Sequence, residues 1–187
     1  MAFLEDLVFE AKSYVEGLRK ETFENCTFSK CDFSASKIIS CGFTDCYFTD
    51  CNLSMADFSQ STLNNVKFKN CKILGVKFSL CHDFIFHVDF DNCILDYSSF
   101  AKRKMAKTGF KGSSLKGVDF GEADLKQSKF IESDLYEAIF YRTNLQEVDF
   151  TTARNYTIDL SQNNAKKARF SRDGLAGLLS QFDIIIG

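Results

Sequence analysis

The sequence contains no proline and no tryptophan, and it has only two histidines among its 187 residues. No stretch approaches the roughly 18 consecutive apolar residues that a membrane-spanning helix requires. The spacing assembles no Ser-His-Asp set, and no glycine-rich phosphate loop is present. We therefore expect neither a membrane protein nor an enzyme, and we expect no cofactor.

The overall composition is that of one ordinary globular domain, with 45% hydrophobic and 26% charged residues. The formal net charge of −2 gives no general reason to expect nucleic acid or an anionic membrane as a partner. The N-terminal stretch "MAFLEDLVFEAKSY" carries acids where a signal peptide would be basic. These features favour a cytoplasmic protein.

Phenylalanine is abundant, with 21 copies, and most of them recur every five residues at a position that we call i. Apolar positions recur about every 3.6 residues in an amphipathic helix and about every 2 residues in a half-buried strand, so neither structure explains a period of five. A first register runs from Phe23 to Phe78 and a second, displaced by two residues, from Phe90 to Phe150, and neither contains a polar residue at i. Position i−2 is also restricted, since only Arg103 there is neither small nor β-branched.

Two inward and three outward residues per block describe one side of a coil, and such blocks stack into a solenoid. From Phe90 to Phe150, Phe alternates with Leu or Met at i, so a coil contains an even number of blocks. Two blocks leave no room for inward side chains, and six enclose space that they cannot fill. We predict a square coil of 20 residues, with Phe on two opposite walls and Leu on the others.

Blocks such as "ADFSQ" (56–60), "ADLKQ" (123–127) and "SDLYE" (133–137) resemble those of pentapeptide-repeat proteins. The resemblance covers roughly residues 21 to 160 and implies an all-β, right-handed quadrilateral β-helix. About seven coils at roughly 4.8 Å would give a rod of about 35 Å. We divide the chain into an N-terminal cap (1–20), a β-helix (21–170) with a register shift at 79–89, and a C-terminal helix and tail (171–187).

The cysteines all fall on i−2 slots, which indicates buried thiols that pack as small hydrophobes. They are Cys26, Cys31, Cys41, Cys46, Cys51, Cys71, Cys81 and Cys93. No CxxC pair is present, so we expect neither a disulfide nor a zinc site. A metal cluster of Cys81, His82, His87 and Cys93 is an alternative, but both histidines flank the register shift at outward positions. Free thiols fit a reducing compartment.

Both ends carry apolar residues at helical spacing. Phe3, Leu7, Ala11, Val15 and Leu18 predict an amphipathic helix that caps the first coil. Near the other end, Ser171 is a candidate N-cap for a short helix. We predict a homodimer through the apolar residues that follow, because they exceed what a lid requires: Leu175, Leu178, Leu179, Phe182, Ile184 and Ile186.

The stretch from Asn155 to Ile184 also resembles the C-terminal end of the quinolone-resistance pentapeptide proteins (Qnr-type). That resemblance implies a dimer joined tip to tip, and a rod that imitates duplex DNA and binds DNA gyrase or topoisomerase IV. An acidic band is the candidate surface for such a partner: Asp119, Glu122, Asp124, Glu132, Asp134, Glu137, Glu147 and Asp149.

The net charge argues against that mechanism, because about 35 Å of duplex carries about 20 negative charges. Six cations between Lys102 and Lys116, with no acid among them, also oppose it. This basic stretch lacks outward aromatic residues, so we do not expect it to bind nucleic acid directly. The sequence favours a non-enzymatic interaction scaffold with a protein partner, and the topoisomerase-directed DNA mimic, which would modulate quinolone sensitivity, is the alternative.

Overall fold

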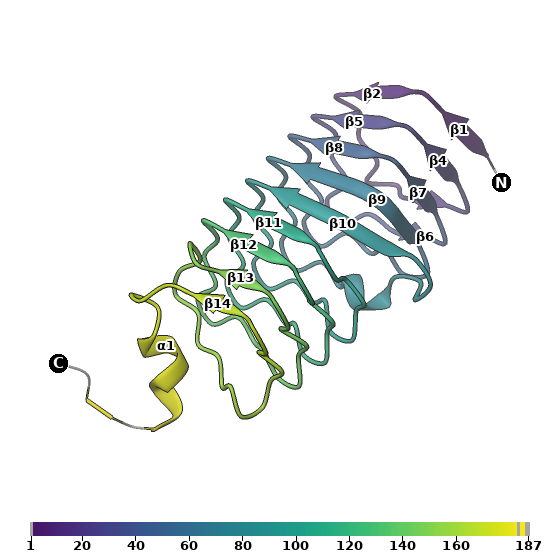
Figure 1. Cartoon of the computed structure of the whole chain (residues 1–187). Helices are drawn as coiled ribbons and strands as arrows, with labels where there is room; N and C mark the ends of the chain where they lie inside the picture. Colours follow the sequence, from purple (N-terminus) through teal and green to yellow (C-terminus); the bar gives the residue numbers. More distant parts are fainter. Residues whose placement is uncertain (1, 183, 186–187) are drawn as a thin grey trace.

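A computed structural model describes residues 2–182 and 184–185, and the chain forms a rod of stacked coils with its termini at opposite ends (Figure 1). The coils make about eight turns of a β-solenoid, followed by one short helix. The all-β solenoid predicted from the five-residue register is therefore confirmed.

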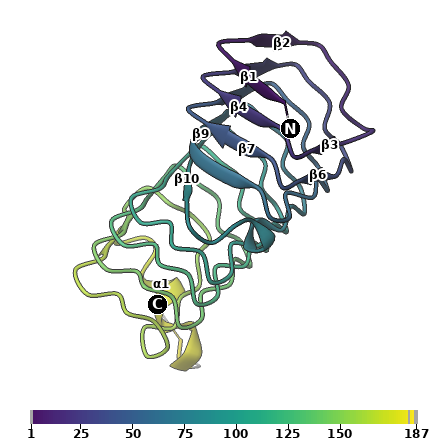
Figure 2. The ribbon, with the colours of Figure 1, turned by 90° about the vertical axis from the view of Figure 1, so that its right-hand side faces the viewer.

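The strands are short, and in the described residues they pair in parallel, as expected for coils that stack directly on one another. The main sheet follows the order β1-β4-β7-β9-β10-β11-β12-β13-β14, and β2, β5 and β8 join it through β9 (Figures 1 and 2). The strands are β1 (Phe3–Glu5), β2 (Val8–Glu10), β3 (Leu18–Arg19), β4 (Thr22–Glu24), β5 (Thr27–Ser29), β6 (Ile38–Ile39), β7 (Gly42–Thr44), β8 (Tyr47–Thr49), β9 (Thr62–Lys69), β10 (Phe86–Asp91), β11 (Gly109–Lys111), β12 (Lys129–Ile131), β13 (Asp149–Phe150) and β14 (Arg169–Phe170).

The pairing register confirms the square coil of 20 residues. Thr22 pairs with Gly42, and Gly42 pairs with Thr62. We number the walls by their inward residue in one coil: Phe110 lies in wall 1, Leu115 in wall 2, Phe120 in wall 3 and Leu125 in wall 4. At most corners the residue at i+2 has a left-handed backbone conformation, as Lys107 does with φ 65°. The Lys107 N–H donates a hydrogen bond to the Lys126 carbonyl of the next coil at 2.8 Å.

The predicted phenylalanine stacks fill the interior of walls 1 and 3. In wall 1 the rings of Phe28 and Phe48 are 4.7 Å apart, and those of Phe48 and Phe68 are 5.0 Å apart. In wall 3 the rings of Phe100 and Phe120 are 5.5 Å apart. Burial of each ring contributes about 1.5 to 3 kcal/mol, so these stacks add strongly to the stability of the rod.

All eight cysteines carry free thiols and lie buried. The Cys51 thiol donates to the Phe28 carbonyl of the preceding coil at 3.3 Å. Serine fills the same role at i−2, since the Ser133 hydroxyl donates to the Phe110 carbonyl at 2.8 Å. At such slots Cys51 and Ser133 each place a small side chain with one donor beside a buried carbonyl, whereas Val118 and Ala123 only fill the space.

The helix predicted for residues 3–18 is wrong, because this segment forms the first coil of the solenoid. Strands β1 and β2 pair with β4 and β5 with an offset of 19 residues instead of 20. Leu4, Phe9 and Tyr14 take the inward positions, and Tyr14 stacks on Phe33 at 4.5 Å. Leu18 follows Tyr14 by four positions instead of five, and this missing residue moves the apolar positions out of the five-residue register. The extra coil also makes the rod longer than the seven coils expected.

The register shift divides into one insertion and one deletion. Phe86 pairs with Leu63 and therefore takes an inward position. It follows Phe78 by eight residues instead of five, which is the insertion. Phe90, the next inward residue, follows Phe86 by four residues instead of five, which is the deletion. The insertion forms a loop after a 3-10 turn, Phe78–Leu80 (η1). Arg103, the exception at i−2, lies buried in the next coil beneath this loop. The two irregularities of the sequence, the inserted loop and the arginine at i−2, therefore contact each other in the structure.

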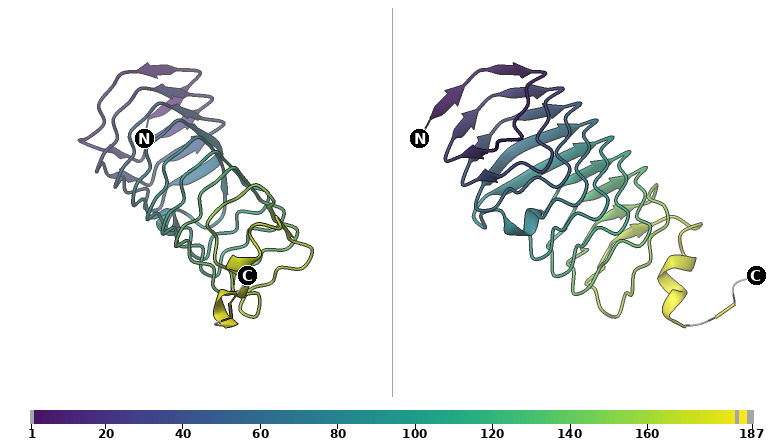
Figure 3. Two further views of the ribbon diagram at one scale, coloured as in Figure 1. Left: turned by 90° about the vertical axis from the view of Figure 1, so that its left-hand side faces the viewer. Right: turned by 180° about the vertical axis from the view of Figure 1, so that it is seen from behind.

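The chain ends in the helix α1 (Ala176–Leu179) and a 3-10 turn η2 (Ser180–Phe182), which lie beyond the last coil (Figure 3). The helix is short, as predicted, but Ser171 is not its N-cap, because the helix begins later in the chain. The Ser171 hydroxyl instead accepts a hydrogen bond from the Gly174 N–H at 3.1 Å in the preceding turn. The division of the chain into three segments stays a prediction.

Candidate interaction surfaces

The outward residues of the rod determine what it can bind, since the inward ones are fully used in packing. In the described part of the chain, no group of three or more His, Cys, Asp and Glu side chains is placed to hold a metal ion. His82 and His87 are both exposed, and His82 Nδ1 accepts a hydrogen bond from the Phe84 N–H at 3.3 Å. Among the same described residues, no helix has the length and apolar character to cross a bilayer.

The predicted acidic band surrounds the rod and does not form a patch on one side. Each wall carries one acid of the band at i−1, the position directly before an inward residue. Each corner carries another acid of the band at i+2. Walls 1 to 4 hold Asp149, Asp134, Asp119 and Asp124, and the corners that follow them hold Glu132, Glu137, Glu122 and Glu147. Because a coil takes 20 residues, a run of acids in the sequence becomes a ring in space.

The basic stretch forms a similar ring one coil nearer the N-terminus. Lys104, Lys111 and Lys116 lie on walls 4, 1 and 2, Lys102 and Lys107 lie at corners, and Arg103 points inside. Adjacent rings of opposite charge meet in ion pairs, with Lys102 3.9 Å from Glu122 and Lys116 3.6 Å from Asp134. The acidic ring is therefore partly neutralised by its neighbour.

Asp149 shows the same neutralisation on wall 1. Partial burial disfavours its charged form, but the Thr151 hydroxyl and amide and the Arg169 guanidinium outweigh this effect and lower the pKa of Asp149. Arg169 lies 2.6 Å from the carboxylate. This acid carries its charge at neutral pH, but a cation of the next coil already pairs with it.

Exposed apolar residues gather where walls 2 and 3 meet, in and next to the coils that carry the acids. We call this set the tyrosine patch: Tyr97, Tyr136, Ile139 and Tyr141. Tyr97 is 70% exposed and Ile139 is 52% exposed, although the other outward positions are mainly polar. The Arg142 guanidinium lies over the Tyr141 ring at 5.1 Å. Tyrosines that stay exposed on a folded surface are typical of protein interfaces.

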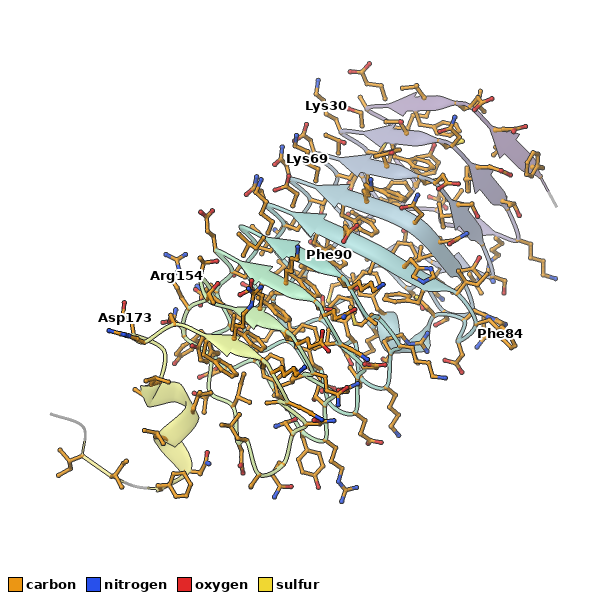
Figure 4. The ribbon with its side chains drawn as sticks, viewed as in Figure 1. Lys30, Lys69, Phe84, Phe90, Arg154 and Asp173 are labelled. Atoms are coloured by element: carbon orange, nitrogen blue, oxygen red, sulfur yellow. The ribbon has the colours of Figure 1, made fainter. Side chains whose placement is uncertain are left out.

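A second apolar feature is the loop at residues 79–85, where Phe84 is 89% exposed and Ile85 is 41% exposed. Figure 4 shows Phe84 at the outer edge of the rod, away from the stacked rings. Arg103 holds the base of this loop, because its guanidinium donates to the carbonyls of Ser79 and His82 at 3.1 Å each. The loop therefore presents an apolar side chain on a supported backbone.

The C-terminal segment divides its apolar side chains between the rod and the outside. Leu178 is buried, whereas Leu175 is 49% and Phe182 is 61% exposed, and Leu179 and Ile184 are also exposed. With Leu160 of the last coil, four of these residues, Leu178 among them, line an open hollow of about 370 Å³. Ile186 of the predicted interface lies outside the described residues. One leucine thus acts as a lid, and the rest stay free for another contact.

Comparison with known sequences assigns the repeat. The profile of the pentapeptide repeat region matches residues 21–100 and 43–120, and the profile of pentapeptide repeats in eight copies matches residues 119–154. The chain belongs to the pentapeptide-repeat family. No curated protein sequence matches it.

The solved structures that this pentapeptide-repeat protein resembles include two trypsin-treated variants of QnrB1, described as a plasmid-mediated fluoroquinolone resistance protein. One is 21% identical with a TM-score of 0.65, and the other is 18% identical with a TM-score of 0.63. Both comparisons cover 100% of each chain. At this identity the likeness establishes the fold and carries no function.

Sequence reasoning missed the tyrosine patch of this pentapeptide-repeat rod. Its signal was present, because Tyr97 stands at i+2 and Tyr136 and Tyr141 at i+1, where most blocks carry polar or small residues. Counting charges along the sequence drew attention to the acids instead. An aromatic residue at an outward position of a repeat is the feature to look for.

Proposed function

We propose that this pentapeptide-repeat protein is a non-enzymatic interaction scaffold that binds a protein partner through the tyrosine patch. The observation that carries the proposal is the exposure of Tyr97, Tyr136, Ile139 and Tyr141 on one edge of the rod. Tyrosine supplies large contact area at a low cost in conformational entropy, and clustered exposed aromatic residues mark interaction sites. Flat walls of fixed spacing suit a scaffold, since they hold such side chains rigidly.

Photo-crosslinking tests this proposal. Benzoylphenylalanine replaces Tyr136 in one variant and Tyr47, a tyrosine of wall 1 that is 42% exposed, in the control, and both are produced in cells that make the chain. We expect a discrete crosslinked protein from position 136 and none from position 47. Crosslinks that are equal at the two positions, or absent from both, would remove the patch as the binding surface.

The same rod also supports a homodimer, which we propose forms through the C-terminal segment. Leu175, Leu179 and Phe182 stay exposed although Leu178 already covers the last coil. Burial of each such side chain contributes about 1.5 to 3 kcal/mol, and several together offset the entropic cost of association. A two-fold interface of this kind would place two rods end to end.

A DNA mimic that binds gyrase or topoisomerase IV is the second candidate, and the acidic ring favours it. Five of the acids, including Asp119 and Glu137, have no cation within ion-pair distance in the described structure. However, the adjacent basic ring interrupts the negative charge along the rod axis, unlike the continuous phosphates of a duplex. We therefore place the scaffold first. A cytoplasmic site of action agrees with the eight free thiols.

A further inference from the structure

The tyrosine patch has a glycine beneath one of its rings. The Tyr97 ring rests on Gly117, where an added Cβ would lie 2.8 Å from Cδ1 of the tyrosine. The Gly117 N–H donates to the Tyr136 carbonyl at 2.9 Å, so the glycine joins the coils of the two tyrosines. Because Tyr97 remains 70% exposed, the side of its ring that does not face Gly117 is available to a partner.

Carboxylates lie beside members of this patch. The backbone of Asp119 forms a parallel β-bridge with Ile139 of the next coil. Its carboxylate accepts hydrogen bonds from the Gly121 N–H at 2.8 Å and the Ser99 hydroxyl at 3.2 Å. The neighbouring Glu137 carboxylate raises the pKa of the Tyr136 phenol. The nearby Lys116 pairs with Asp134. A partner would therefore meet aromatic faces and negative charge together.

The structure contains an example of the side chain that suits this surface. The Arg142 guanidinium lies 5.1 Å from the Tyr141 ring centre. A guanidinium stacks on an aromatic face and pairs with a carboxylate through its planar fork, which an ammonium does less well. An acidic segment would meet repulsion from Glu137 and Asp119.

Building on the proposed function, we propose that the partner contacts the tyrosine patch through arginine side chains. An arginine-bearing protein segment lies across Tyr97 and Tyr136, with guanidinium groups on the rings and against the carboxylates of Asp119 and Glu137. The surface thus selects a basic peptide segment by stacking as well as by charge.

Fluorescence anisotropy with labelled octa-arginine, octa-lysine and octa-glutamate peptides tests this inference. We expect the arginine peptide to bind about fivefold more tightly than the lysine peptide, because a guanidinium stacks on each of the two rings better than an ammonium does. The octa-glutamate peptide should not bind. A Tyr97→Leu, Tyr136→Leu double variant should lose the preference for arginine, and the control Tyr47→Leu should keep it. The melting temperatures of both variants should stay close to that of the wild type, because these side chains are exposed.

Equal affinity for the arginine and lysine peptides would overturn the inference, as would a preference that survives in the double variant. A crosslinked partner at position 136 together with no preference for arginine would reject arginine recognition and leave the scaffold in place. No crosslink at position 136 would reject the scaffold, whatever the peptides do, and the inference with it.

Discussion

The buried guanidinium of Arg103 donates a hydrogen bond to the carboxylate of Asp83, a residue of the loop one coil earlier. The two partners differ in exposure, since 5% of the Arg103 side chain and 90% of the Asp83 side chain is accessible. The same guanidinium lies over the Phe86 ring at 5.7 Å. The arginine therefore belongs to the interior of the rod, while the acid only covers its outer end.

Removal of the two partners should have unequal effects. We expect Arg103→Ala to lower the free energy of unfolding by about 2 to 4 kcal/mol, because it loses packing on Phe86 and the donors for two carbonyls. Asp83→Asn should cost less than about 1 kcal/mol, as expected for an exposed ion-pair partner. Chemical denaturation of both variants measures the difference. Equal losses would mean that the ion pair, and not the interior contacts, holds the loop.

The stacked rings should contribute strongly to stability. Phe120 lies 5.5 Å from Phe100 and 5.3 Å from Phe140, ring centre to ring centre. We expect Phe120→Ala to lower the free energy of unfolding by about 3 to 5 kcal/mol, while the exposed control Lys129→Ala changes it by less than about 0.5 kcal/mol. Similar melting temperatures for the two variants would contradict the inward register.

Two of the buried thiols, Cys46 and Cys81, predict a loss of stability at alkaline pH. Burial raises the pKa of Cys46 to about 11 and that of Cys81 to about 12, against about 8.5 for an unfolded thiol. Below about pH 8.5 both states keep the proton, so these thiols cause no pH dependence. Above it the unfolded state loses protons first, and stability falls as the pH rises toward the folded pKa. Melting temperatures measured from about pH 7 to about pH 11 should therefore fall above about pH 8.5.

Serine provides the control for this alkaline effect, because it already fills equivalent slots such as Ser61 and Ser133 and does not titrate. The Cys46→Ser, Cys81→Ser double variant should show a shallower fall with pH than the wild type. A fall of the same steepness would assign the effect to other groups.

The C-terminal segment predicts a dimer at micromolar concentration. Phe182→Asp should give a monomer of nearly unchanged stability, because Phe182 is 61% exposed in the single chain. Leu178→Asp should instead destabilise the last coil, since Leu178 is buried there. Light scattering with thermal unfolding separates the two effects. A wild-type mass of one chain would reject the dimer.

The sequence was sufficient for the repeat itself, because every inward position from Phe23 to Phe78 and from Phe90 to Phe150 obeys one spacing rule. It failed where the rule is broken. The deletion between Tyr14 and Leu18 created a false helical pattern, and only pairing with the second coil reveals the strands. The place of Arg103 depends on the loop at 79–85, a contact between coils that local spacing does not express.

The candidate site was harder to predict than the fold. Charge counted along the chain suggested an acidic band, but coiling distributes those acids around the rod, as Asp119 on wall 3 and Asp149 on wall 1 show. The tyrosine patch combines Tyr97 with Tyr136, residues from different coils. Outward residues carry no periodic constraint, so their meeting depends on the three-dimensional stacking.

A gyrase supercoiling assay, with and without a quinolone, tests most directly whether the rod acts as a scaffold and not as an imitation of duplex DNA. The purified protein is titrated into the reaction through the micromolar range. We predict unchanged supercoiling and unchanged inhibition by the quinolone at every concentration, because the basic ring beside the acidic one interrupts the negative charge. Inhibition of supercoiling by the protein, or relief of quinolone inhibition, would contradict the account, most clearly if neutral substitutions at Asp119 and Glu137 abolished it.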